Sequence, residues 1–185
     1  MKKILLASLI AATAATTTFA ADDTTAGTTA ATTVAGGSVT INGEITAGAC
    51  AISSDDSNKI VTLDTVPSSK FTAAGQAANT KKQFTITLVD CDTDSAKSVD
   101  LTFKGMQDAD VASLLANTAG AGGAKNVGVQ LYNQDGSVLP VNTGTASFPI
   151  NTTVPMMFAA DYVATAAAVT AGRVEAVANF ELTYQ

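Results

Sequence analysis

The sequence has no histidine and no tryptophan, and aromatic residues make up only 5% of its 185 residues. Without histidine, the chain lacks the side chain that most often serves as a general base or a metal ligand. It also has no serine–histidine–aspartate set, no phosphate-binding loop and no zinc-ligand cluster. Sugar sites usually rely on aromatic faces, for which three tyrosines offer little. The sequence therefore predicts neither an enzyme nor a cofactor site.

Two acidic pairs and one glycine-rich stretch are the remaining candidates for a small-ligand site. Asp92-Thr93-Asp94 and Asp108-Ala109-Asp110 resemble the start of a calcium loop, but neither continues into the full EF-hand pattern. They are interpreted as solvated loop acids. The glycines at 120, 122 and 123 are interpreted as a loop, because no helix start follows them.

Long apolar runs are also lacking, since nothing after the first 20 residues is apolar for long enough to span a bilayer. Residues 1–20, MKKILLASLIAATAATTTFA, have a charged start, an apolar run and a small-residue end. This is the pattern of a secretory signal peptide. A membrane anchor is disfavoured because the run is short and diluted with threonine. Thr18 and Ala20 suit the positions before the cut, which predicts cleavage after Ala20.

Basic residues are scarce in the chain that cleavage would leave. It would carry 8 Lys and Arg against 16 Asp and Glu, a net charge of −8. An acidic, aromatic-poor chain is a poor candidate for binding nucleic acid or an anionic membrane surface. The acids are scattered along the sequence, so solubility is the interpretation preferred here.

Cysteine occurs only at Cys50 and Cys91. An even number in an exported chain favours a disulfide. The chain-entropy model gives roughly 4 kcal/mol for closing a loop of this length. A redox role would need a CxxC-like pair near a basic group, which neither cysteine has. A structural disulfide is therefore predicted.

The most informative stretch is SVTINGEITAGAC, residues 38–50. Its apolar and polar residues alternate, which is typical of an extended strand with one buried face. One face would carry Val39, Ile41, Gly43 and Ile45. The preceding residues 21–37 are rich in Ala, Thr and Gly, with Val34 as their only large apolar residue. Such a segment is predicted to be flexible in the monomer, so the strand has no hairpin partner nearby.

The rest of the chain is predicted to be a series of short strands separated by turns. An antiparallel β-sandwich, immunoglobulin-like in outline, is the fold that this pattern favours. A short helical turn is expected over 108–116, and a turn at Asn133-Gln134-Asp135-Gly136. The expected strands are 60–63, 83–91, 99–104, 127–132, 138–141, 154–163 and 174–185.

The last predicted strand ends at the last residue, so no later segment can cover its outer edge. A long apolar edge strand is a liability that proteins normally manage. The simplest hypothesis is that the strand predicted within residues 38–50, which has no partner nearby in the sequence, pairs with this edge in another copy of the chain. Such β-strand addition is head-to-tail, and its repetition gives an open filament.

At this point the sequence resembles the major subunits of chaperone–usher fimbriae, the type 1-like pilins. The resemblance runs over the whole chain after the signal. It rests on four motifs, taken with the signal peptide and the spacing of the cysteines: TTVAGGSVTINGEITAGACAI, VDCDT, NVGVQLYNQDGSVL and ANFELTYQ with its penultimate Tyr184.

The resemblance implies an all-β fold, an incomplete immunoglobulin-like sandwich that lacks its final strand. A periplasmic chaperone would lend a strand, which an outer-membrane usher would exchange for the next subunit's leader, building an extracellular fimbrium for cell adhesion. The donor strand would be Val39, Ile41, Gly43 and Ile45, with Val34 and Gly37 upstream. Gly43 would sit where only a hydrogen side chain fits. The acceptor edge would be Phe180, Leu182 and Tyr184, with the Gln185 carboxylate anchored by basic chaperone residues.

This gives three segments: a signal peptide (1–20), an extension carrying the donor strand (21–45), and a pilin domain (46–185). The main hypothesis is a polymerising structural subunit that contacts other pilins, a chaperone and an usher, without nucleic acid or membrane insertion. The alternative is a minor or tip subunit, or an adhesin-like binding module of the same fold. Fold alone does not settle a subunit's position in the fibre.

Overall fold

The computed structural model describes residues 36–43, 45 and 48–185. The chain divides into two units at residues 43 and 44, and each is described by itself. In the first unit, residues 36–43 carry no helix or strand and are all exposed. The second unit is all-β, with nine strands in its described part and a single turn of 3-10 helix at Ser68–Lys70. No helix of the described residues is both long and apolar enough to cross a membrane.

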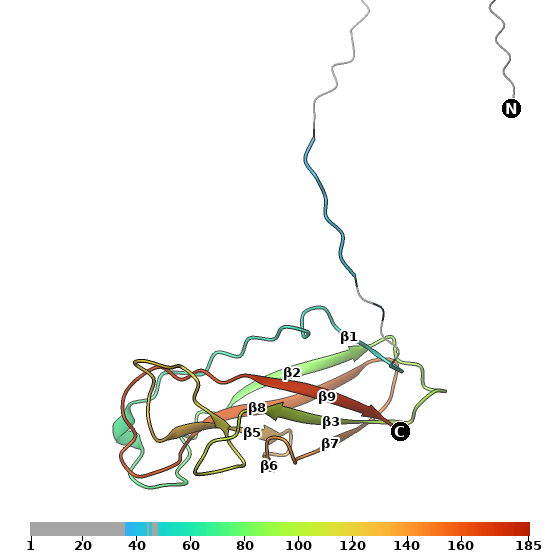
Figure 1. Cartoon of the computed structure of the whole chain (residues 1–185). Helices are drawn as coiled ribbons and strands as arrows, with labels where there is room; N and C mark the ends of the chain where they lie inside the picture. The colour runs from blue at the N-terminus through green and yellow to red at the C-terminus, as the bar shows by residue number, and fades with distance from the viewer. Residues whose placement is uncertain (1–35, 44, 46–47) are drawn as a thin grey trace, which may run out of the picture. The chain divides into compact units, whose positions relative to one another are not determined.

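The strands form two antiparallel sheets (Figure 1). The larger sheet has the order β1-β2-β8-β5-β4, with β6 also paired to β5, and the smaller has the order β7-β3-β9. The strands of the larger sheet are β1 (Ala51–Ile52), β2 (Lys82–Val89), β4 (Leu115–Ala116), β5 (Val127–Asn133), β6 (Val138–Leu139) and β8 (Val154–Ala164). Those of the smaller sheet are β3 (Ser98–Gly105), β7 (Ala146–Pro149) and β9 (Ala178–Tyr184).

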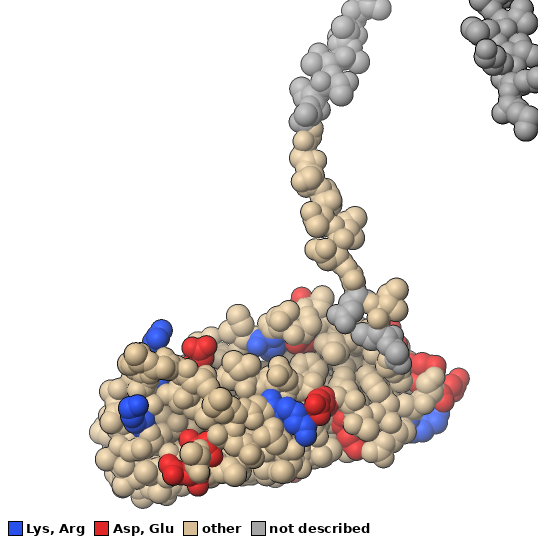
Figure 2. Space-filling view, in the orientation of Figure 1, with Lys and Arg blue, Asp and Glu red and all other residues tan. Residues whose placement is uncertain are grey.

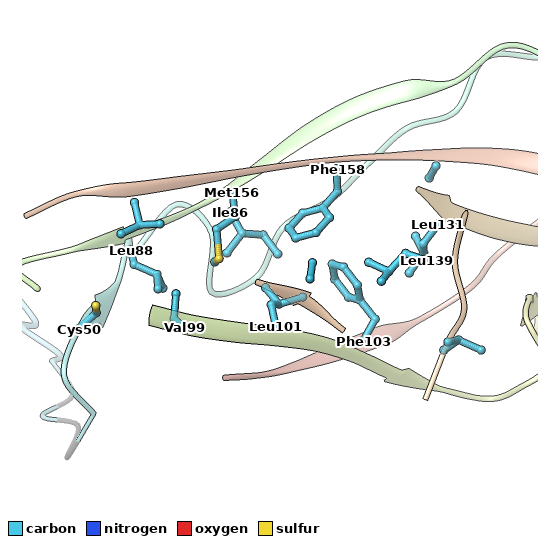
Figure 3. Close-up of a cluster of buried hydrophobic side chains, with 14 of the residues drawn as sticks. Cys50, Ile86, Leu88, Val99, Leu101, Phe103, Leu131, Leu139, Met156 and Phe158 are labelled. Atoms are coloured by element: carbon cyan, nitrogen blue, oxygen red, sulfur yellow. The ribbon is translucent and has the colours of Figure 1, made fainter. Parts of the chain in front are cut away.

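The core lies between the two sheets, where inward-facing side chains of β2 and β8 meet those of β3 (Figure 3). Phe158 on β8 is 1% exposed, and its ring lies edge-on to Phe103 with 5.0 Å between centroids. Phe84 and Phe148 also stack on Phe158, each with 5.8 Å between centroids. A fully buried aromatic contact of this kind joins the layers of a sandwich.

The turn predicted at residues 133–136 is confirmed, and it joins β5 to β6. The Gly136 N–H donates to the Asn133 carbonyl at 2.9 Å, and the positive φ of Gly136, 83°, explains the glycine. The strands predicted around β2, β3, β5, β8 and β9 also form, with ends shifted by a few residues. All-β architecture with two antiparallel sheets is therefore confirmed.

Two local expectations are wrong. Residues 108–116 form no helix: a turn in which the Leu114 N–H donates to Val111 leads into the short strand β4. Residues 60–63 form no strand, although Val61 and Leu63 are half-buried as period two requires. In this single chain the described residues of 38–50 carry no strand, and pairing with β2 begins only at Ala51. The donor strand expected there would pair with another copy and stays a prediction.

The face seen in Figure 2 is largely uncharged, with lysines, arginines and acids in small scattered groups. One acid of the described domain is fully buried, on the face of β8 that points away from the core between the sheets. The Asp161 carboxylate, 0% exposed, accepts the Thr80 N–H at 3.2 Å and the Tyr162 N–H at 2.9 Å. These bonds satisfy a group that would otherwise be costly to bury, and they fix the segment before β2 to the middle of the larger sheet.

We expect Phe158→Ala to lower the free energy of unfolding by about 3–5 kcal/mol, because it leaves a cavity between the sheets. The control is Val138→Ala at a site that is 51% exposed, which should cost under about 1 kcal/mol. Urea unfolding followed by circular dichroism measures both. Equal losses in the two variants would contradict this assignment of the core.

Candidate functional site

An open groove of about 960 Å³ runs along the domain beside β9. One wall is formed by residues 56–63 and the other by Val174 and residues 176–180. The floor consists of core side chains from both sheets, among them Phe84, Ile86, Phe103, Leu115 and Leu131. The groove therefore opens directly onto the hydrophobic core, at the place where a further strand of the smaller sheet would lie.

The wall formed by β9 presents backbone hydrogen-bonding groups as well as side chains. Gln185 and Ser98 exchange both of their backbone hydrogen bonds, at 2.9 and 3.0 Å. Since bonded and non-bonded pairs alternate in an antiparallel ladder, the odd-numbered residues of β9 bond to β3. The even-numbered residues direct their N–H and C=O groups to the opposite edge, where no described strand pairs with them: Ala178, Phe180, Leu182 and Tyr184.

The side chains of these same even-numbered residues are half-buried and pack against the core. The alternation continues upstream, where Val174 and Ala176 are half-buried and Glu175 and Val177 are exposed. At each even-numbered residue, a backbone donor and acceptor at the open edge therefore stand next to an apolar side chain that packs against the core. An extended segment laid along this edge would find both hydrogen bonds and apolar contacts.

The opposite wall exists because the chain leaves the larger sheet after β1. The Ser53 N–H still donates to the Thr87 carbonyl at 2.9 Å, but the Thr87 N–H donates to the Asp56 carboxylate at 2.7 Å. Asp56 thus takes the place of a strand carbonyl and ends the pairing with β2. It is 4% exposed and also accepts a hydrogen bond from Lys59 at 2.5 Å. The following residues then run apart from the sheet and form the wall.

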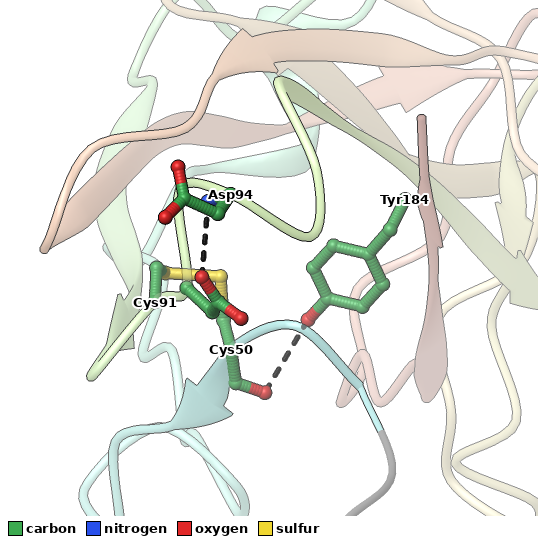
Figure 4. Close-up of a disulfide and its surroundings, with 5 residues drawn as sticks. Cys50, Cys91, Asp94 and Tyr184 are labelled. Carbon is green, nitrogen blue, oxygen red and sulfur yellow. Dashed lines mark hydrogen bonds between the residues drawn. A yellow bond between two sulfur atoms is a disulfide. The ribbon is translucent and has the colours of Figure 1, made fainter.

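One end of β9 is fastened near the disulfide (Figure 4). Cys50 and Cys91 are bonded, as predicted, with 4.1 Å between their Cα atoms. The Tyr184 hydroxyl donates to the Cys50 carbonyl at 3.5 Å, and its ring lies against Gly48. Burial raises the pKa of this hydroxyl. The disulfide, Tyr184 and the first residues of β1 thus form one cluster at this end.

The structure distributes the predicted acceptor residues unevenly. Phe180 lines the groove, whereas Leu182 and Tyr184 follow on the same face of β9 and do not line it. The Gln185 carbonyl oxygen accepts the backbone N–H groups of Lys97 and Ser98, at 2.6 and 3.0 Å. Asp56 was not predicted from the sequence, and residues 60–63 were predicted as a strand, not as part of a groove wall. The alternation at 60–63 was the available signal for that wall.

The predicted donor residues that the structure describes are open to solvent. Val39, Ile41 and Ile45 are 87%, 89% and 101% exposed. Gly37 and Gly43 are exposed and have no neighbouring atoms where a Cβ would stand. Val34 and residues 1–20, with the predicted cleavage after Ala20, lie outside the described residues. The chain thus carries three exposed large apolar side chains at alternating positions.

The two acidic pairs bind backbone groups of their own turns. Asp92 accepts the Asp94 N–H at 3.0 Å, and Asp108 accepts the Asp110 N–H at 3.0 Å. Such side-chain-to-backbone bonds two residues apart are typical Asx turns. Both pairs therefore have a local structural role.

The hydrogen bonds of Asp56 predict an acid-sensitive contribution to stability. Burial acts to raise the pKa of Asp56, but the hydrogen bonds from Lys59 and Thr87 outweigh it and hold the pKa below its ordinary value of 3.8. A carboxyl whose pKa is lower in the folded state stabilises that state above its unfolded pKa. This stabilisation is lost as the pH falls through the folded value.

We therefore expect Asp56→Asn to lower the thermal midpoint at neutral pH, by an amount that shrinks on acidification below pH 3.8. Asp110→Asn, at an exposed position, is the control and should give little difference at either pH. Differential scanning calorimetry across this range measures both variants. A difference for Asp56→Asn that does not change with pH would contradict the role of its charge.

Comparison with known proteins places these features in a family. The model of the family described as "Fimbrial protein" matches residues 39–185. The chain is 37% identical over 150 residues to the probable major fimbrial subunit LpfA of Escherichia coli O157:H7, covering 80% of this chain and 84% of the relative. It is 38% identical over 162 residues to the minor fimbrial subunit HifD of Haemophilus influenzae, covering 80% and 74%.

The fold is also found among solved structures. A subunit in the structure of a chaperone–usher pilus superposes with a TM-score of 0.68 at 25% identity, covering 84% of this chain and all of that chain. The family match spans most of the sequence, including the groove, the disulfide and β9. The chain therefore belongs to the fimbrial protein family and is a fimbrial subunit.

Proposed function

We propose that this chain is a structural rod subunit that polymerises by donor-strand exchange and so supports cell adhesion. The leader of one copy, within residues 21–45, would lie in the groove of the next copy. The observation that carries this proposal is the open edge of β9. Its even-numbered residues combine unpaired backbone groups with apolar side chains in the described domain.

The leader has the chemistry that this edge requires. Val39, Ile41 and Ile45 alternate with polar residues and are fully available for burial. In an extended strand these side chains point to one face, toward the groove, while the backbone pairs with β9. Gly37 and Gly43 fall on the same face and add no side chain to it, and Val34 would extend the contact upstream. Burying each large apolar side chain contributes about 1.5–3 kcal/mol.

The same exposed edge would need cover before assembly. We propose that a periplasmic chaperone supplies a temporary strand and that an outer-membrane usher exchanges it for the leader of the incoming subunit. The signal peptide at 1–20, cleaved after Ala20, would direct the chain to that route. Gln185 would contribute to chaperone binding through its carboxylate, beside the backbone contacts that it makes with Lys97 and Ser98.

A minor or tip subunit of the same fold is the second candidate. The resemblance to HifD, a minor subunit, is as high in identity as the resemblance to LpfA, a probable major subunit. Both roles use the same groove, so the geometry does not separate them. Quantitative immunolabelling of isolated fimbriae would do so: labelling along the whole shaft supports a rod subunit, and sparse or terminal labelling supports the alternative.

The decisive experiment is thermal unfolding of a chain that begins at Gly43, with and without a peptide of residues 31–45. Ligand that binds only the folded state at about 100 times its Kd stabilises it by about 2.7 kcal/mol. For a domain of this size, we therefore expect the midpoint to rise by roughly 5–10 °C. A scrambled peptide of the same composition is the control. A stable domain with an unchanged midpoint would show that its groove needs no added strand, against the proposal.

The proposed register makes a sharper prediction about Gly43. Gly43→Trp places a large ring on the groove-facing side of the leader, so we expect fimbriae to be lost or strongly reduced. Thr40→Trp adds the same ring to the opposite face and is expected to assemble. Electron microscopy and shearing of surface fimbriae compare the two variants. Normal fibres from Gly43→Trp would show that this face does not enter the groove.

A further inference from the structure

Residues 42 and 43 form the only asparagine–glycine pair in the chain. Both residues are exposed, and neither belongs to a helix or strand. No described residue outside the pair's immediate chain neighbours lies within 4 Å of where a Gly43 Cβ would stand. Glycine has the widest backbone freedom of any residue. The Gly43 nitrogen can therefore reach the side chain of Asn42 without a steric barrier.

We propose that Asn42 is a site of spontaneous deamidation, open in the unassembled subunit and protected in the fibre. The Gly43 backbone nitrogen attacks the side-chain carbonyl carbon of Asn42 and forms a five-membered imide. The bond from that carbon to the side-chain nitrogen breaks, and ammonia leaves with the proton of the Gly43 amide. Water then opens the imide at one of its two carbonyls, giving aspartate or isoaspartate. The net change consumes one water, releases one ammonia and involves no redox step.

A second pair in the same chain shows what protection requires. Asp135 and Gly136 also place a glycine after a side chain that can form an imide, but every group is engaged. The Asp135 carboxylate accepts the Ser137 N–H at 2.8 Å and the Ser137 hydroxyl at 2.6 Å. The Gly136 N–H donates to Asn133 at 2.9 Å. These bonds also lower the pKa of Asp135, and an ionised carboxylate is a poor electrophile.

Assembly would protect Asn42 in the same way, and this part of the inference rests on the proposed function. A leader held as a strand in the groove is fixed in the extended conformation. In antiparallel pairing with β9, the N–H groups of its groove-facing residues, Gly43 among them, bond to the even-numbered residues of β9. The Gly43 nitrogen then no longer approaches the Asn42 side chain. Asn42 in an inserted leader is thus protected from deamidation, whereas Asn42 in an unassembled subunit deamidates with time.

The two products would differ in their effect on insertion. Asn42 occupies the face of the leader opposite Ile41 and Gly43, so aspartate there would stay in solvent and leave the register unchanged. Isoaspartate adds a methylene group to the backbone, which displaces Gly43 and Ile45 relative to Val39 and Ile41. Because the side chains of a strand alternate with a strict period of two residues, this shift moves the apolar side chains after residue 42 away from the groove positions that they would otherwise fill. Subunits that carry isoaspartate at position 42 would therefore fail as donors, whereas those that carry aspartate would still insert.

The test is a time course of the complete mature subunit and of assembled fimbriae in the same mildly alkaline buffer. Peptide mapping by mass spectrometry and an isoaspartate methyltransferase assay measure each asparagine. In the unassembled subunit we expect Asn42 to deamidate at least about tenfold faster than Asn133, and in fimbriae at least about tenfold more slowly than in the subunit. Asn42→Gln should remove the isoaspartate signal.

Two results would overturn the inference: Asn42 reacting no faster than Asn133 in the subunit, or at equal rates in subunit and fibre. The effect on insertion is read from peptides of residues 31–45 carrying aspartate or isoaspartate at 42. The isoaspartate peptide should raise the midpoint less than the aspartate peptide, and equal rises would contradict the register shift. If even the unmodified peptide gives no rise, the proposed function fails by itself, because the deamidation rate of the subunit is measured without any peptide.

Discussion

The unpaired edge of β9 is the constraint on which the rest of this structure depends. Buried backbone donors and acceptors must be satisfied, and in an immunoglobulin-like sandwich the strand beside β9 would do this. In the described domain that strand is absent, and the chain between β1 and β2 runs apart as a wall instead of closing the gap. The edge is long, apolar and flanked by a groove that reaches the core. Such an edge favours strand addition over solvent exposure.

Several features of the domain keep the groove open. Asp56 accepts the Thr87 N–H and so ends the pairing of the larger sheet at the start of the groove wall. The Cys50–Cys91 disulfide and the contact of Tyr184 with the Cys50 carbonyl hold β1 and β9 at the same end of the domain. The aromatic cluster around Phe158 joins the sheets, and two of its rings, Phe84 and Phe103, line the floor of the groove. These contacts are all made within the domain, so they hold the two walls of the groove in place without a strand between them. An incoming strand would therefore meet a preformed site.

The sequence alone predicted the features that local pattern determines. Alternation predicted β2, β3, β5, β8 and β9, the turn residues predicted Gly136, and the paired cysteines predicted the disulfide. It failed at 108–116, where helical spacing of Val111 and Leu114 was overridden by pairing of Leu115 with Val129. It also failed at 60–63, because alternation reports one buried face and says nothing about a backbone partner. The role of Asp56 depends on Thr87, 31 residues away, and no local signal marks it.

In the proposed assembly, the donor segment of one copy and the acceptor groove of another make a heterologous contact, which has consequences beyond a single pair. Repetition of such a contact without closure gives a filament, and in the proposed assembly each subunit would depend on its neighbour for the final strand of its own core. In such a fibre the subunit at one end would always have an open groove, so the unpaired edge would move along the fibre without being removed. Assembly from a precursor covered by a temporary strand, released only when the next leader arrives, would protect this edge at every step. In this view the exposure of Val39, Ile41 and Ile45 is the monomer's half of an interface whose other half is the edge of β9.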